Sequence, residues 1–189
     1  LRLQKIPLIG ILARKKTNFP RAVLYGDIIK GLPGIGAGSC DAVYCSHVLE
    51  HLSLKDFYTA LMNSYSILKQ GGVFRCVLPD LEWAVQQYLS EKQNNVAEAS
   101  IHFMQNTLLG TEERPGSIKD KVIDMFGNSN HLWMWDKDSL HQAFVNAGFA
   151  SVRKCTYGDA ADKHFLLVEK KATQMNRHHK CARQLLVAS

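Results

Sequence analysis

Two histidines and a glutamate stand at a spacing that could support chemistry. His47, Glu50 and His51 spell H-x-x-E-H, which in one class of zinc hydrolase places two imidazoles and a water-activating carboxylate on one helix face. That arrangement requires residues 45–52 to be helical. The preceding residues are typical of a strand and Ser53 is typical of a helix N-cap, so we predict a turn here and no bound metal. A zinc hydrolase using these three residues remains an alternative.

A second group of large side chains lies far along the chain. His131, Trp133 and Trp135 stand at alternate positions, so in an extended segment all three face one way. Such a row could form a wall that holds a ring-shaped acceptor. It could equally be core that seals a cap onto a sheet, because aromatic side chains bury large areas.

Alternating strand and helix patterns must position these residues. Ala42–Ser46 and Val73–Leu78 are short apolar runs, with a helix expected from Ser53 between them and another after Asp80. This order predicts an α/β fold with a doubly wound, mostly parallel sheet. A helix is expected over Ser139–Ala147. Two closing strands, Val152–Tyr157 and Phe165–Glu169, suggest an antiparallel hairpin at the sheet edge.

Ligands of an open parallel sheet bind beyond the carboxyl ends of its strands. That rule selects Asp27, which follows a strand expected at Val23–Gly26, together with Glu50, His51 and Asp80. Asp80 is equally suited to cap the next helix, and His51 to bond a turn carbonyl.

Length and composition favour one packed domain. The 189 residues are 46% apolar, and we predict a single domain over residues 1–170, with a helical insertion or cap at 94–126 and a flexible basic tail at 171–189. The net charge of +6 is concentrated at the two ends, since six basic and no acidic residues precede Asp27 and four basic and no acidic residues follow Lys170. Solvated arms explain this pattern, so we do not expect nucleic acid as a partner.

Two further patterns bear on the compartment. The five cysteines include no C-x-x-C pair, which favours a reducing, cytoplasmic location. The apolar run Ile6–Ala13 is far shorter than the roughly 20 residues of a spanning helix, so no membrane association is expected.

Four blocks in linked order resemble the second half of a class I S-adenosylmethionine-dependent methyltransferase domain of the type-11 kind. They are Asp27–Pro33, Ser39–Leu52, Ile67–Arg75 and Val77–Asp80. Asn130–Asp136, Ala147–Phe149 and Tyr157–Asp159 resemble an uncharacterised bacterial branch of that superfamily, and the likeness spans about Val23 to Glu169. It implies a Rossmann-like fold, S-adenosylmethionine as cofactor, and methyl transfer to a small-molecule or saccharide-like acceptor.

The resemblance also implies roles for single residues. Asp27, with Ile28 beside it, would contact the adenine of the donor, and Ser46 and His47 would border its methionine and adenosine portions. A base is needed where the acceptor carries a proton, and the catalytic candidates are His51 and Glu50. The candidates for acceptor binding are Asp80, His131, Trp133 and Trp135.

One part of such a domain has no counterpart before Asp27. The donor is held by a strand, a glycine-rich turn and a helix, and Gly10 is isolated. We therefore expect an N-terminally incomplete domain, with a catalytically inactive methyltransferase-like binding module as the alternative. The missing strand would leave Ala42–Ser46 unpaired. We expect Ile6–Leu12, upstream residues or a second chain to fill that place, the last of these making a homo-oligomer.

Overall fold

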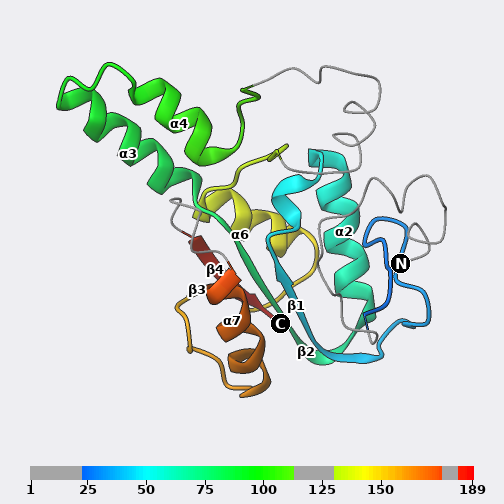
Figure 1. Ribbon diagram of the computed structural model, residues 1–189. Coiled ribbons are helices and arrows are strands. Elements are labelled where there is room, and N and C mark those ends of the chain that lie inside the picture. The colour runs from blue at the N-terminus through cyan, green and yellow to red at the C-terminus, as the bar shows by residue number, and fades with distance from the viewer. Residues whose placement is uncertain (1–22, 113–129, 176–182) are drawn as a thin grey trace.

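The computed structural model describes residues 23–112, 130–175 and 183–189 (Figure 1). Four strands in these ranges form one sheet in the order β1-β2-β4-β3. They are β1 (Cys40–Ser46), β2 (Leu68–Pro79), β3 (Arg153–Cys155) and β4 (Arg183–Ala188). β1 pairs with β2 in parallel, and β4 is antiparallel to both β2 and β3. Three of the four strands therefore run in the same direction, in agreement with the predicted α/β class.

Helices connect and cover these strands. The described ones are η2 (Leu49–His51, a 3-10 turn), α2 (Leu54–Ile67), α3 (Leu81–Gln93), α4 (Ala99–Thr107), α6 (Lys137–Asn146) and α7 (His164–Met175). Within the described ranges, every helix is too short or too polar to cross a membrane.

Helix α2 begins where the sequence predicts. The Ser53 hydroxyl accepts a hydrogen bond from the backbone N–H of Asp56 at 3.2 Å, as an N-cap should. The helix ends at Ile67, because Leu68 is already extended. β2 accordingly begins five residues earlier than Val73 and contains Gly71, whose φ is +73°.

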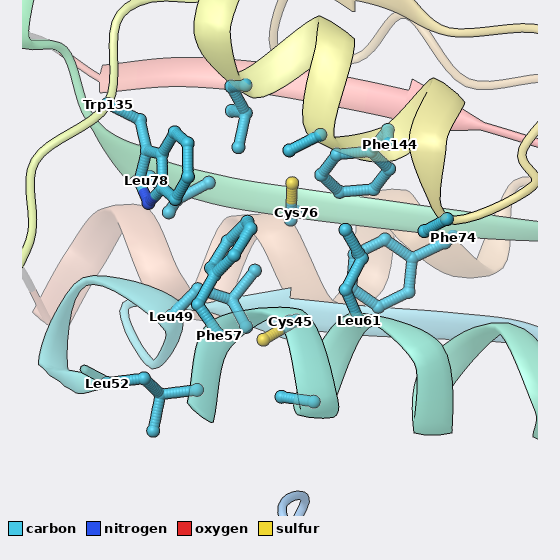
Figure 2. Packing of buried hydrophobic residues seen from close by; sticks show 14 of the residues in the cluster. Cys45, Leu49, Leu52, Phe57, Leu61, Phe74, Cys76, Leu78, Trp135 and Phe144 are labelled. Atoms are coloured by element: carbon cyan, nitrogen blue, oxygen red, sulfur yellow. The ribbon is translucent and has the colours of Figure 1, made fainter. Parts of the chain in front are cut away.

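One face of the sheet packs against α2 and α6. Alternate residues of β2, namely Phe74, Cys76 and Leu78, point into this core, where the ring centroids of Phe74 and Phe144 lie 5.4 Å apart. Figure 2 shows this layer, with Phe57 and Leu61 of α2 on one side and Phe144 of α6 on the other. Alternation along β2 sends the intervening residues to the opposite face.

Helix α7 covers that opposite face, across the sheet from α2 (Figure 1). Arg75 of β2 is fully buried there and its Nε donates to the Glu169 carboxylate. Its Nη1 donates to the Asp159 carbonyl at 2.7 Å, and its Nη2 to the Thr156 carbonyl at 3.1 Å. The sheet is thus covered on both faces, as a doubly wound fold requires.

The predicted hairpin of Val152–Tyr157 with Phe165–Glu169 is wrong in its second strand. Phe165–Glu169 is helical within α7, and β3 pairs with β4 instead. The physical reason is a period of four: Phe165 and Glu169 are buried, whereas Leu167 and Val168 between them are exposed. A run of only five residues fits both this helical period and the strand period of two, so the sequence alone does not distinguish a helix from a strand here.

The flexible tail expected at 171–189 is also corrected. α7 extends to Met175, and Arg183–Ala188 form β4, which lies between β2 and β3. Within the expected insertion 94–126, α4 packs against α3, with the Tyr88 and Phe103 rings 5.8 Å apart. Residues 113–126 lie outside the described ranges.

The strand expected at Val23–Gly26 does not form. Residues 23–26 are outside regular structure, and Leu24 is 83% exposed. Among the described residues, β1 is an edge strand of the sheet. Residues 6–12, which we expected beside it, lie outside the described ranges, so that expectation stays a prediction.

Candidate functional site

The chain turns sharply at the carboxyl end of β1. His47 directly follows the strand with a φ of +53°, a left-handed conformation that is uncommon for any residue with a side chain. Its backbone N–H donates to the Val77 carbonyl at 3.0 Å, which keeps Ser46 and His47 against the neighbouring strand. The turn leads into η2, which holds Glu50 and His51. Because residues 45–52 form no α-helix, the helical geometry of an H-x-x-E-H zinc hydrolase is absent.

Glu50 is the buried acid of this turn, with 1% of its surface exposed. Its Oε1 lies 3.0 Å from Nδ1 of His47. Its backbone carbonyl accepts from the backbone N–H groups of Leu132 and Trp133, at 2.8 and 3.2 Å. Burial, and then the Glu50 charge, raises the pKa of the neighbouring Cys45 thiol to about 12. The carboxylate therefore lies inside the protein, where its charge acts over short distances with little screening.

His51 bonds the distant segment that carries the tryptophans. Its Nδ1 lies 3.0 Å from the carbonyl oxygen of Asn130. A carbonyl can only accept, so Nδ1 carries a hydrogen, and in the neutral ring Nε2 then carries the lone pair. The turn-carbonyl bond anticipated for His51 is thus present, and it leaves Nε2 for chemistry.

The segment 130–135 does not present its three large groups as one wall. His131 is buried, and its ring meets that of His51 edge-on at 5.0 Å. Trp135 is 4% exposed and packs on Phe57 with ring centroids 4.3 Å apart, whereas Trp133 is 40% exposed. The segment is irregular rather than extended, so the period-two argument fails and the residues occupy different environments.

Asp80 ends β2 beside this segment. Its Oδ1 accepts from the Trp83 N–H at 3.2 Å and caps α3, and its Oδ2 lies 3.6 Å from Lys154 Nζ. A backbone bridge joins Asp80 to Trp135. The helix-cap interpretation of Asp80 therefore holds, and the same residue adjoins the candidate acceptor segment.

Asp27 and Ile28 lie elsewhere, against the last turns of α2. Asp27 Oδ1 accepts from the N–H groups of Ile29 and Lys30, at 2.9 and 3.3 Å, and its Oδ2 is 3.5 Å from Lys30 Nζ. The bond from Ile29 leads the contacts that lower the pKa of Asp27. Asn63 donates to the Ile28 carbonyl at 2.8 Å, and Ile28 lines a hollow of about 360 Å³ with Gly31 and Leu32.

Two groups of predicted site residues thus emerge. His47, Glu50, His51, His131, Trp133, Trp135 and Asp80 gather around η2 and segment 130–135, at the carboxyl ends of β1 and β2. Asp27 and Ile28 form the second group. The Ile28 carbonyl accepts from Asn63, which is nine residues from the start of α2 and therefore about 13 Å along that helix. The sequence did not reveal that His131 meets Glu50 and His51, which lie far before it in the chain.

Comparison with known proteins decides the family. A family model described as a methyltransferase domain matches residues 10–154. The chain belongs to the methyltransferase-domain family. This membership confirms the resemblance drawn from the sequence blocks. A comparison with curated proteins gave no match.

Solved structures of methyltransferases resemble this methyltransferase domain at low identity. A SAM-dependent methyltransferase from Archaeoglobus fulgidus is 15% identical, with a TM-score of 0.45, 95% of this chain covered and 71% of that one. One from Mesorhizobium loti is 14% identical, with a TM-score of 0.43 and coverages of 98% and 76%. PigF, solved with SAH, is 15% identical, with a TM-score of 0.43 and 87% of this chain covered; the match spans 34% of the PigF chain. The family match, rather than these likenesses, carries the assignment.

Proposed function

We propose that this methyltransferase domain transfers a methyl group from S-adenosylmethionine to an oxygen or nitrogen of a small-molecule or saccharide-like acceptor. The observation that carries the proposal is the family match over residues 10–154, a range that includes both groups of candidate residues.

The donor side of the proposal rests on Asp27, Ile28, Ser46 and His47. Asp27 Oδ1 already accepts from two backbone N–H groups, while Oδ2 has only Lys30 Nζ at 3.5 Å among the described residues. Oδ2 is therefore the atom that we assign to the adenine amino group. Ser46 ends β1 and His47 follows it, at the strand end where the sulfonium of the donor would meet the acceptor.

The acceptor side rests on Trp133 and the Glu50–His51 turn. Trp133 offers a partly exposed indole, and its backbone N–H donates to the Glu50 carbonyl, so this residue lies next to the candidate base. In the reaction, an acceptor hydroxyl would lose its proton to Nε2 of His51 as its oxygen bonds the methyl carbon. The carbon–sulfur bond breaks, and sulfur keeps the electron pair as the neutral thioether of S-adenosylhomocysteine.

Calorimetric titration of the 189-residue chain with S-adenosylhomocysteine tests the donor side. We expect Asp27→Asn to weaken binding by about five-fold to a hundred-fold, because the adenine amino group loses a charged acceptor. The melting temperature should change little, since the amide oxygen still accepts from Ile29. Asp41→Asn is the control, because Asp41 is likewise an acid paired with a lysine, Lys69 at 2.6 Å, and lies apart from both groups of candidate residues. Unchanged affinity in Asp27→Asn, with altered stability, would assign Asp27 to its ion pair with Lys30 alone.

A further inference from the structure

Glu50, His51 and His131 form a compact group of metal-ligand side chains beside the β1 turn. One ligand atom from each lies within 4.8 Å of those from the other two. We propose that these three side chains bind one Zn²⁺ ion. Two imidazoles and one carboxylate are a donor set that zinc takes in proteins. The ligand set differs from the H-x-x-E-H motif, since His131 replaces His47.

The Glu50 carboxylate supplies the first argument. It is 1% exposed, Oε1 is held by His47, and buried Oε2 has no hydrogen-bond partner among the described residues. A buried carboxylate oxygen without a partner is costly, and a cation offsets that cost directly. Ligating carboxylates in metal sites are themselves hydrogen-bonded through their second oxygen, which is the role His47 fills here.

The orientation of His51 supplies the second argument. Its Nδ1–H donates to the Asn130 carbonyl at 3.0 Å, so the ring presents Nε2 as its ligand atom. A histidine that binds metal through one nitrogen usually donates the other N–H to a carbonyl or carboxylate, which fixes the tautomer. This arrangement is therefore present before any ion binds.

Backbone bonds hold the third residue of the group, His131, in place. The His131 N–H donates to the Leu108 carbonyl at 3.0 Å, and the next residue, Leu132, donates to the Glu50 carbonyl at 2.8 Å. The His51 and His131 rings already meet at 5.0 Å. Ligand atoms around a tetrahedral zinc lie about 3.4 Å apart. Side-chain rotations that bring the ligand atoms closer by about 1.5 Å or less would therefore close the site.

Three protein ligands leave one tetrahedral position for water or for an acceptor atom. On the proposed function, the ion would bind the acceptor oxygen and make its hydroxyl more acidic, so that the proton passes to water and not to Nε2 of His51, whose lone pair the ion would occupy. That last step rests on the proposed function, whereas zinc binding does not.

Zinc binding is measured on the full chain, stripped with chelator and titrated with ZnCl₂ by calorimetry. The background carries His178→Ser, His179→Ser and Cys181→Ser, because these residues could bind zinc on their own. We expect one ion per chain, and a melting temperature raised by about 5–10 °C at a free zinc concentration of about 100 times Kd. Co²⁺ absorption in the visible range reports the ligand geometry independently.

Matched variants locate the ion. Glu50→Gln, His51→Gln and His131→Gln should each weaken binding by about 100-fold or more, and His47→Gln by about 10-fold, as an outer-shell partner does. His102→Gln is the control, since His102 pairs with Glu91 at 2.9 Å on the surface. Where a buried variant fails to fold, His51→Gln, which is only partly buried, carries the test.

Two results would overturn the inference: no zinc binding below millimolar concentration, or equal binding in the ligand variants and in His102→Gln. The S-adenosylhomocysteine titration is run separately on the same samples. Zinc binding without nucleoside binding would retain this site and refute the proposed function, and the reverse pattern would do the opposite.

Discussion

At the scale of single residues, the two tryptophans of segment 130–135 lie in different environments. Trp135 is buried against Phe57 and Tyr58, with ring centroids 4.3 and 6.3 Å away, while Trp133 is 40% exposed. Burial of a large ring stabilises the fold, and the more exposed ring beside the candidate base is the one that we propose contacts the acceptor.

Substitution of each tryptophan by alanine should distinguish a contribution to stability from a contribution to acceptor binding. Trp135→Ala should lower the free energy of unfolding by about 3–5 kcal/mol, because a large cavity opens in the core. Trp133→Ala should lower it by less than about 1 kcal/mol. Urea denaturation measures both. Once an acceptor is found, Trp133→Ala should reduce its turnover and leave S-adenosylhomocysteine affinity intact. A large stability loss in Trp133→Ala would instead assign that ring to the core.

At the scale of elements, capping residues set where helices begin. Asp136 caps α6: its Oδ1 accepts from the Ser139 N–H at 2.8 Å and from the Ser139 hydroxyl at 2.7 Å. These two bonds lower the pKa of Asp136, and the bond from the Ser139 hydroxyl has the larger effect. Both bonds favour the ionised form, so the cap carries a pH dependence.

Asp136→Ala should destabilise the protein by about 1 kcal/mol at neutral pH. Because the folded pKa lies below 3.8, the contribution is fully present above that value and is lost as the pH falls through the folded pKa. The difference between wild type and variant should therefore shrink when urea denaturation is repeated from pH 7 down to about pH 3. Asp136→Asn is the control, because its side-chain oxygen can cap the helix but does not titrate, so the stability difference between Asp136→Asn and Asp136→Ala should not change with pH. A difference between wild type and Asp136→Ala that stays constant with pH would contradict the capping account.

At the scale of the whole molecule, Arg75 ties three distant parts of the chain together. From the middle of β2 it reaches Glu169 of α7 and the carbonyls of Thr156 and Asp159 in the loop between β3 and α7. Glu169 returns to that loop, accepting from the Gly158 N–H at 3.2 Å. A buried charge with this many partners holds α7 on the sheet.

Glu169→Gln should lower the free energy of unfolding by about 3–5 kcal/mol, because Arg75 would keep its charge in a buried site without the opposite charge. Chemical denaturation, followed by circular dichroism, measures the loss. Asp159→Asn is the control: it removes the exposed partner of Arg153 at 2.6 Å, and exposed pairs contribute little. Equal stability of Glu169→Gln and wild type would mean that packing of Phe165, and not the ion pair, fixes α7.

The sequence by itself determined the elements whose signals are local. The Ser53 and Asp80 caps, the apolar runs of β1 and β2, and the parallel order they imply all follow from neighbours within a few residues. It also determined the family, since the linked blocks from Asp27 to Asp80 fall inside the matched range 10–154. Local signals failed at Phe165–Glu169, because this short run fits both the strand period of two and the helical period of about four.

Only the tertiary structure decided which distant residues meet. Nothing near Arg183–Ala188 in sequence indicates that this strand lies between β2 and β3, because its partners are supplied by residues about 30 and 110 positions earlier. The pairing of His131 with Glu50 and His51 is likewise made by backbone bonds from Leu132 and Trp133 to the Glu50 carbonyl. Such contacts depend on chain closure over long loops, which leaves no periodicity in the sequence.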